Sequence, residues 1–275
     1  MFKIGMFTSG YQRNNLEDMF VDAARFGYDY IELWGGRPHA YAPDLAAGDI
    51  DEIIRLRDKY GVPITGYCPE HNAYPYNFMI GSERQREDAV RYLKVCLDQA
   101  VKLGSDFMLV SPAHAGYDTT YAQMRDRLYR TIEDLAAYAR NVGVKLVVET
   151  LTPEESNCFN SANDLLELFE HVDNDYLYGM MDIVPPYLQQ EQMMSYFTLL
   201  GDKLYHLHIP DSNGADATHL IPGEGVMPYK ELMQEIRDLP YERTATIELV
   251  TNYINEPRLY AKRAINNVRA MLAEE

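Results

Sequence analysis

Four side chains able to bind a divalent metal ion lie in the second half of the sequence, and each belongs to a short apolar run. They are Glu149 in "KLVVET", Asp182 in "YGMMDIV", His208 in "LYHLHI" and Glu248 in "ATIELV". A single acid of this kind is explained by a strand end that meets water, and two could form a structural ion pair. Four in succession would make a costly buried charge cluster unless a cation were present. The pattern therefore favours a metal site.

The donor set limits which metal fits. Three carboxylates and one imidazole suit Mn²⁺, Co²⁺, Ni²⁺, Fe²⁺ or Mg²⁺ better than a metal that prefers thiolates, and Zn²⁺ stays open. The run that holds His208 also holds His206 on the same face, because side chains alternate along a strand. His206 should lie about 6 to 7 Å deeper. We therefore predict that His208 is the ligand and that His206 is a hydrogen-bonded interior histidine.

The elements that must position these ligands alternate regularly. Short apolar runs are separated by longer amphipathic stretches, and in residues 88–104 the apolar side chains recur at helical spacing. Several helical stretches end on a glycine just before the next strand, at Gly27, Gly61, Gly104, Gly143 and Gly201. The strand candidates are residues 3–7, 30–34, 63–68, 107–113, 145–150, 178–184, 204–209 and 245–250.

Eight strand–helix units without a hairpin signal predict a parallel sheet, and eight parallel strands close a barrel. We therefore predict one α/β domain over residues 1–275, a (β/α)8 TIM barrel. An open doubly wound sheet is the alternative, but "FTSGYQRNN" after the first strand lacks the glycine-rich phosphate fingerprint. The active site of a TIM barrel forms at the C-terminal ends of its strands, so the four ligands would meet at one rim.

The overall charge bears on possible partners. The net charge is −17, with Asp+Glu 42 against Lys+Arg 25. This excess repels phosphate groups, so neither nucleic acid nor a membrane is expected as a partner. Three cysteines without metal-ligand spacing favour free thiols in a reducing cytosol. The N-terminal segment lacks a signal-peptide pattern, and no apolar run is long enough to span a bilayer. We expect a cytoplasmic homo-oligomer whose partner is a small-molecule substrate.

The segments around the four ligands resemble a known family. "VVET", "MMDIV", "HLHIPDSNG", "PGEG" and "TIELV" resemble the xylose isomerase-like TIM barrels that isomerise or epimerise sugars. The ligand positions resemble those of ketose 3-epimerases of the tagatose/psicose type. Longer segments, such as "IELWGGRPHAYAPDL" and "ELVTNYINEPRLYA", resemble family members that act on fructosamines. The resemblance implies a divalent metal held by Glu149, Asp182, His208 and Glu248, with Glu149 and Glu248 as the acid/base pair.

Three further residues are expected to contact the substrate. Glu155 matches a family glutamate that hydrogen-bonds a terminal substrate hydroxyl. His219 stands near the place of a family arginine that contacts substrate hydroxyls, which indicates a changed contact. His114, at the end of the predicted fourth strand, faces either the pocket or a neighbouring loop. Pro185 is a second departure, because ketohexose epimerases and the related zinc nucleases have a histidine there; its absence disfavours a multi-zinc nuclease site.

The predicted chemistry is epimerisation of a ketose at carbon 3. A metal ion can stabilise an enediolate, and two glutamates on its opposite faces can alternate as base and acid. The resemblance implies that a fructosamine is the substrate, with interconversion of fructoselysine and psicoselysine. The alternatives within the enzyme class are a free ketohexose 3-epimerase and an aldose–ketose isomerase. The alternative outside it is a barrel that binds a sugar without turnover or serves as a partner-binding protein.

Overall fold

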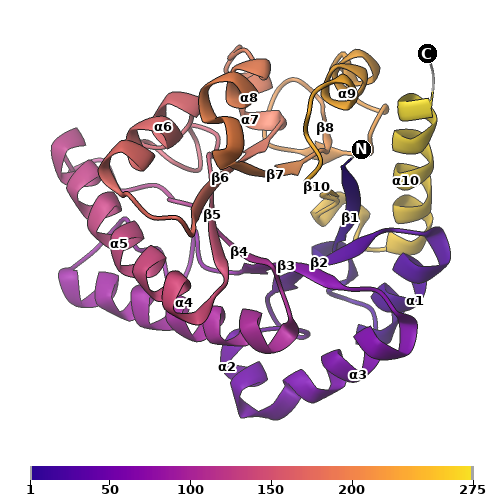
Figure 1. Ribbon diagram of the computed structural model, residues 1–275, viewed down its shortest axis with the longest axis horizontal. Helices are drawn as coiled ribbons and strands as arrows, with labels where there is room; N and C mark the ends of the chain where they lie inside the picture. Colours follow the sequence, from indigo (N-terminus) through magenta and orange to yellow (C-terminus); the bar gives the residue numbers. More distant parts are fainter. Residues whose placement is uncertain (1, 274–275) are drawn as a thin grey trace.

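The computed structural model describes residues 2–273 and confirms the predicted barrel (Figure 1). Eight parallel strands close in the order β1-β10-β7-β6-β5-β4-β3-β2. The bounds of the barrel strands are β1 Lys3–Phe7, β2 Tyr30–Gly35, β3 Ile64–Pro69, β4 Phe107–Val110, β5 Lys145–Glu149, β6 Leu177–Asp182, β7 Leu204–His208 and β10 Thr244–Ile247.

Helices surround the barrel and connect successive strands (Figure 1). Serine or threonine caps begin several of them; α4 and α5, for example, start with capping boxes at Ser82 and Thr120. The α-helices are α1 Leu16–Phe26, α2 Ala42–Asp44, α3 Ile50–Tyr60, α4 Glu83–Leu103, α5 Tyr121–Val142, α6 Ala162–His171, α7 Val184–Leu188, α8 Met194–Leu200, α9 Tyr229–Asp238 and α10 Pro257–Ala273. Short helical turns lie at Ser9–Tyr11, Leu45–Asp49, Gly201–Lys203 and Thr251–Tyr253.

Three sequence predictions about the elements need correction. The fourth and last barrel strands end earlier than predicted, at Val110 and Ile247. A two-stranded antiparallel pair, β8 Asp211–Ser212 with β9 His219–Leu220, lies in the segment after β7, although no hairpin was expected. Gly201 does not adopt the left-handed cap of the other predicted glycines: its φ is 51° and its ψ is −124°, and it opens a 3-10 turn. These short departures leave the barrel unchanged.

Strand register brings the predicted ligands to the same rim. Asp182 on β6 is paired with His208 on β7. His208 is also level with Thr246 on β10, two residues before Glu248. Glu149 is level with Met180 of β6, so it lies one strand further round and two residues lower than Asp182. Because β5, β6, β7 and β10 are consecutive in the barrel, their last residues converge without any long-range loop.

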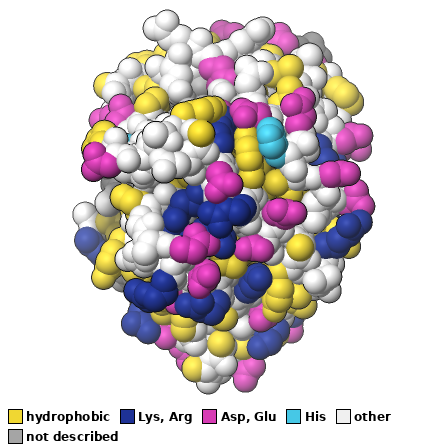
Figure 2. All heavy atoms as spheres, turned by 90° about the vertical axis from the view of Figure 1, so that its left-hand side faces the viewer, with side chains coloured by type: hydrophobic (Ala, Val, Ile, Leu, Met, Phe, Trp, Pro, Cys, Tyr) yellow, Lys and Arg dark blue, Asp and Glu magenta, His cyan; other side chains and the backbone are white. Residues whose placement is uncertain are grey.

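Charges of both signs are interleaved on the outer face that carries the N-terminal ends of α4 and α5 (Figure 2). Arg130 of α5 lies 3.1 Å from Glu83 of α4 and 3.0 Å from Asp126. The strongly negative net charge is therefore not concentrated on this face. None of the helices within residues 2–273 combines the length and hydrophobicity required to cross a bilayer.

Candidate metal and active site

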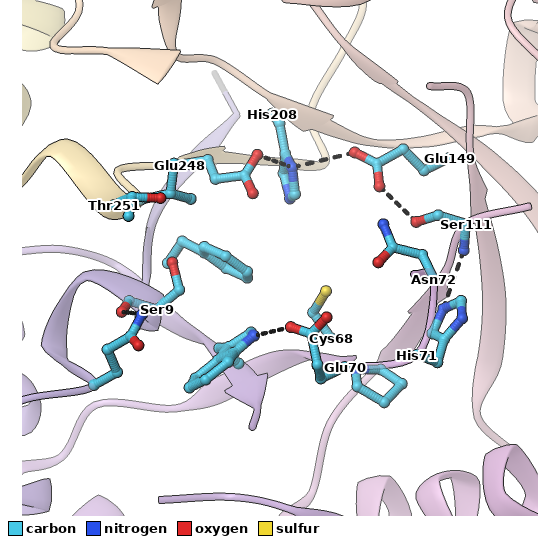
Figure 3. A pocket seen from close by; sticks show the side chains of 15 residues that line it. Ser9, Cys68, Glu70, His71, Asn72, Ser111, Glu149, His208, Glu248 and Thr251 are labelled. Carbon is cyan, nitrogen blue, oxygen red and sulfur yellow. Dashed lines mark hydrogen bonds and ion pairs between the residues drawn. The ribbon is translucent and has the colours of Figure 1, made fainter. Parts of the chain in front are cut away.

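The structure brings Glu149, Asp182, His208 and Glu248 together at the C-terminal rim. One ligand atom from each lies within 4.8 Å of the others, and all four side chains are largely buried. His208 stands between the two glutamates (Figure 3), with Nδ1 at 2.8 Å from Oε2 of Glu248 and 3.6 Å from Oε1 of Glu149. Only Glu248 lies outside a regular strand, immediately after β10. The predicted cluster is therefore present as a geometric unit.

Two buried atoms of this cluster make no hydrogen bond of good geometry within residues 2–273. They are Nδ1 of His208 and Oε2 of Glu248, which face each other at 2.8 Å as an ion pair. Buried polar atoms without partners are costly in a folded protein. A divalent ion coordinated by carboxylate oxygens and one imidazole nitrogen would satisfy them together. The residues present therefore fit a metal ion.

A buried glutamate that the sequence analysis missed fixes the orientation of His208. Glu32 of β2 is fully buried and accepts hydrogen bonds from Nε2 of His208 at 3.2 and 3.3 Å. It also accepts one from Nε2 of His206 at 2.9 Å, and Nδ1 of His206 contacts Oγ1 of Thr244 at 2.8 Å. With Nε2 of His208 donating to Glu32, Nδ1 is directed at the cluster. The prediction that His206 is an interior histidine is confirmed.

The electrostatic environment separates the two glutamates. Burial raises the pKa of Glu149 to about 8; His208 opposes this shift, and the carboxylates of Glu248 and Asp182 reinforce it. Burial also acts to raise the pKa of Glu248, but the positive charges of His208 and His219 outweigh it and lower that pKa. Two carboxyls whose environments move their pKa values apart can serve as an acid and a base. Glu149 is the protonated member of the pair at neutral pH when no ion is bound.

Ser111, just after β4, is a second residue that the sequence analysis missed. Its hydroxyl donates to Oε2 of Glu149 at 2.8 Å, and its backbone N–H donates to Nε2 of His71 at 3.3 Å (Figure 3). Burial lowers the pKa of His71 to about 4, so this imidazole is neutral and can accept that hydrogen bond. Ser111 thus binds Oε2 of Glu149, and the other carboxylate oxygen, Oε1, faces His208. A serine at a strand end is too common a feature to have indicated this contact.

His219, predicted as a substrate contact, lies against the cluster. Its Nε2 is 3.2 Å from Oδ2 of Asp182, and its Nδ1 is 3.2 Å from Oε2 of Glu248. Burial acts to lower the pKa of His219, but Glu248 and Asp182 outweigh it and raise the pKa well above its usual value. Oδ1 of Asp182 accepts from the backbone of Val184 at 2.8 Å, which directs Oδ2 toward the cluster.

The loop that carries His219 is held by one buried acid. The carboxylate of Asp211 accepts hydrogen bonds from the backbone N–H groups of Gly223 and Gly225, each at 3.0 Å. A side chain at Gly225 would collide with Oδ1 of Asp211 and the carbonyl oxygen of Ser212, because a Cβ would lie 2.3 Å from each. The "PGEG" segment therefore needs glycine there for the loop to close over Asp211. This closure fixes the position of His219.

Two cavities adjoin the cluster. The larger, of about 290 Å³, lies on the β1–β4 side and includes Trp34, Glu70 and Asn72 in its walls. Figure 3 shows Glu70 opposite the row formed by Glu149, His208 and Glu248. The smaller, of about 100 Å³, lies on the other side. Its lining residues are Asn72, Glu149, Leu151, Thr152, Glu155, Asp182, Pro185, Ala217, His219 and Glu248. The cluster therefore stands between two separate cavities.

Of the other predicted substrate contacts, Glu155 lines the smaller cavity and His114 packs within its own loop. Glu155 lines the smaller cavity, where its Oε2 accepts hydrogen bonds from Thr152. Pro185, the departure from the family pattern, lines the same cavity. The ring of His114 packs edge-on against Tyr117, and its Nδ1 accepts from the backbone of Gly116 at 3.0 Å. The contacts of the His114 ring are thus with its own loop.

Sequence comparison agrees with this architecture. The sequence pattern of the family described as xylose isomerase-like TIM barrel matches residues 20–271. The chain belongs to this family. Fructoselysine 3-epimerase from Shigella flexneri is 51% identical over 273 residues, covering 99% of each chain. Fructoselysine 3-epimerase from Escherichia coli O157:H7 matches to the same extent. As a member of this family with such relatives, the protein is an isomerase of the epimerase type.

Solved structures of other proteins show the same fold. The 3-keto-D-glucoside 4-epimerase from E. coli superposes with a TM-score of 0.82 at 17% identity, covering 98% of this chain and 100% of that one. D-psicose 3-epimerase from Clostridium cellulolyticum H10, solved with D-tagatose, gives a TM-score of 0.80 at 18% identity over 98% of this chain and 99% of its own. At these identities the likeness concerns the fold alone.

Proposed function

We propose that the protein is a divalent-metal-dependent ketose 3-epimerase that interconverts fructoselysine and psicoselysine. The observation that carries this proposal is the convergence of Glu149, Asp182, His208 and Glu248 at one rim, in a chain 51% identical over nearly its full length to a fructoselysine 3-epimerase. Within the donor set, Mn²⁺, Co²⁺, Ni²⁺, Fe²⁺ and Mg²⁺ are preferred on chemical grounds, and Zn²⁺ stays open.

The chain's own residues provide the acid and the base. Glu149 and Glu248 lie on either side of His208, so a flat intermediate held in front of the cluster has one carboxylate on each face. One glutamate removes the proton from carbon 3, and the other returns a proton on the opposite face. Ser111 keeps the Glu149 carboxylate oriented throughout. The chemistry that a bound divalent ion supplies is stabilisation of the negative charge on the oxygens at carbons 2 and 3.

The presence of both glutamates favours an epimerase over a protein that only binds sugar. A binding protein requires no carboxylate on each side of the ligand, and a hydrolase does not need this symmetry. An aldose–ketose isomerase could use the same metal with its base at another carbon. The difference between isomerase and 3-epimerase therefore depends on which carbon of the substrate lies between Glu149 and Glu248.

The test combines metal content with a substrate panel. The purified protein should contain about one divalent ion per chain, measured by elemental analysis, and lose activity when a chelator removes it. Fructoselysine, fructose, psicose and tagatose should then be incubated side by side in D₂O. Deuterium at carbon 3 with inversion, fastest for fructoselysine, is the expected result.

A ligand variant provides the control for metal dependence. Asp182→Asn keeps the side-chain shape but removes a charged donor, so metal binding and activity should fall together. Deuterium at carbon 1 instead of carbon 3 would indicate an aldose–ketose isomerase. Binding of these sugars with no exchange in metal-loaded protein would indicate a binding protein and overturn the proposal.

A further inference from the structure

A third cavity lies next to the 290 Å³ cavity beside the metal cluster. It has a volume of about 320 Å³, and we call it the outer cavity; its lining residues are Trp34, Gly36, Arg37, Tyr41, Glu70 and Pro75. Trp34 and Glu70 line both cavities. The hydrogen-bonded Trp34–Glu70 pair is therefore the boundary that the two cavities share, and a ligand long enough to pass over this pair would reach from the cluster into the outer cavity.

The walls of the outer cavity are aromatic and anchored. Nε1 of Trp34 donates to Oε2 of Glu70 at 2.8 Å, which fixes the indole. The ring of Tyr41 stacks on that of Tyr92 with centroids 5.8 Å apart, and its hydroxyl contacts that of Tyr76 at 3.1 Å. Flat, immobilised aromatic walls suit an aliphatic chain, because they bury methylene groups without losing side-chain freedom on binding.

Opposite charges lie at the ends of these walls. Oε1 of Glu70 has no hydrogen bond to any described residue, so it can accept one from a ligand. Arg37 donates from Nε and Nη2 to Asp44 at 2.7 and 2.8 Å, and within residues 2–273 its Nη1 has no hydrogen-bond acceptor. The guanidinium lies over the ring of Tyr41, 4.8 Å from its centroid. Arg37, which can bind an anion, and Glu70, which can bind a cation, thus line the same cavity.

We infer that the outer cavity binds the amino-acid end of the amine arm of the substrate. Arg37 binds the α-carboxylate, Glu70 binds the α-ammonium group, and Trp34 and Tyr41 cover the methylene chain between that end and the sugar. Arg37 can take this role through Nη1, while its Nε and Nη2 stay paired with Asp44 and hold the guanidinium in place. The inference rests on the proposed function, and it names the part of the site that distinguishes a fructosamine of lysine from a free ketose.

The dimensions of the two arms agree with this assignment. A ketose held at carbons 2 and 3 extends its short hydroxylated arm to one side and its carbon-1 arm to the other. The smaller cavity, of about 100 Å³ and lined by Thr152 and Glu155, suits the short arm with its hydroxyl groups. An extended lysine side chain attached at carbon 1 places the amino acid about 9 Å from carbon 2, as expected from ordinary bond lengths. The larger cavity and the outer cavity together provide the longer space.

The experiment compares two substrates that differ only in the amino-acid end. Fructoselysine carries it, and the fructosamine of butylamine has the same secondary amine and alkyl chain without it. For each variant, the ratio of kcat/KM for fructoselysine to kcat/KM for the butylamine conjugate is measured. Arg37→Ala and Glu70→Gln should each lower this ratio about tenfold, through KM, as expected for loss of one charged contact at an accessible site. The amide of Glu70→Gln can still accept from Trp34, so the indole stays in place.

Two further variants sharpen the result. Arg37→Lys keeps the charge without the planar fork, so its ratio should lie between those of wild type and Arg37→Ala. Arg55→Ala is the matched control, because Arg55 forms the same kind of side-on pair with Glu52 on the surface of α3. Its ratio should equal that of wild type. Turnover of the butylamine conjugate by each variant shows at the same time that the protein is folded.

The outcomes separate this inference from the proposed function. If wild-type, metal-loaded protein turns over neither conjugate, the proposed function fails. If wild type prefers fructoselysine but Arg37→Ala and Glu70→Gln retain that preference, the function stands and the outer cavity is not the subsite. Equal turnover of both conjugates by wild type likewise overturns the inference, because no amino-acid end is then recognised.

Discussion

Strands β5, β6, β7 and β10 carry the four predicted metal ligands on or next to their last residues, whereas most polar cavity residues of the β1–β4 half lie in loops beyond the strands. Glu149, Asp182 and His208 are each the final residue of a strand. Glu70 and Ser111, by contrast, follow β3 and β4. Strand register therefore positions the residues of the β5, β6, β7 and β10 half, which we call the ligand half. Loop conformation positions most polar residues of the β1–β4 half, which we call the substrate half. We expect the ligand half to determine the chemistry and the substrate half to determine which substrate is accepted.

Glu32 connects the two halves. It belongs to β2, yet its carboxylate reaches across the barrel interior to both histidines of β7. Burial acts to raise the pKa of Glu32, but His208 and His206 outweigh it and hold that pKa well below its usual range. A permanent negative charge beneath His208 favours the tautomer that directs Nδ1 at the cluster. A residue of the substrate half thus also holds a residue of the ligand half, His208, in position.

The largest expected effect comes from the two glutamates. Glu149→Gln and Glu248→Gln should each reduce inversion at carbon 3 by about 10²–10⁴-fold, because each removes one member of the acid/base pair. Each variant keeps the other carboxylate, which can still exchange solvent deuterium into one epimer without inverting it. The two variants should therefore differ in which epimer exchanges, as NMR in D₂O would show. Metal occupancy must be measured first, and near wild-type inversion by metal-loaded Glu248→Gln would refute the two-base mechanism.

The next effect tests the connection between the halves. Glu32→Gln should weaken metal binding by about 10–100-fold, since the amide no longer holds His208 as a charged acceptor does. Isothermal titration with Mn²⁺ gives the affinity directly, and thermal unfolding shows whether the barrel remains intact. Glu52→Gln, a surface change on α3, is the control and should bind Mn²⁺ as wild type does. Unchanged Mn²⁺ affinity in Glu32→Gln would mean that the position of His208 does not depend on Glu32.

The pH dependence of metal binding probes the ligand half alone. At pH 7 without metal, Glu149 holds a proton because its pKa is raised to about 8. His208 holds one as well: burial acts to lower its pKa, but Glu248 and Glu32 outweigh it and raise the pKa well above its usual value. Metal binding must release such protons, so affinity should rise by at least about tenfold per pH unit between pH 6 and pH 8. Calorimetry in buffers of different ionisation enthalpy counts the protons, and no release at pH 7 would contradict the assigned ligands.

The smallest effect concerns a contact made by the substrate half. Ser111→Ala removes the hydroxyl that orients Glu149, and kcat should fall about fivefold, the size of one ordinary hydrogen bond. Metal affinity should change less, because no ligand atom is lost. Ser111→Thr restores a hydroxyl and should recover part of the rate. A loss of metal without a change in kcat of the loaded enzyme would assign Ser111 to the ligand half instead.

The barrel and its four predicted ligands can be deduced from the amino-acid sequence alone. Eight apolar runs with period and spacing typical of parallel strands predict closure, and strand alternation then places Glu149, Asp182 and His208 at the C-terminal rim. It also separates His206 from His208 by depth. These features are local or follow from regular register, so they can be deduced without coordinates.

The contacts between the β1–β4 half and these ligands depend on how the barrel closes. The carboxylate of Glu32 is 174 residues from His206 in sequence, and Ser111 is 38 residues from Glu149, so their contacts arise from barrel closure and not from any local pattern. An acid within the apolar run "YIELW" was the one available signal for Glu32. The Trp34–Glu70 contact likewise joins strand β2 to the loop after β3, whose conformation depends on packing. Loops obey no fixed period, and for that reason the sequence predicted the ligands but not the cavities around them.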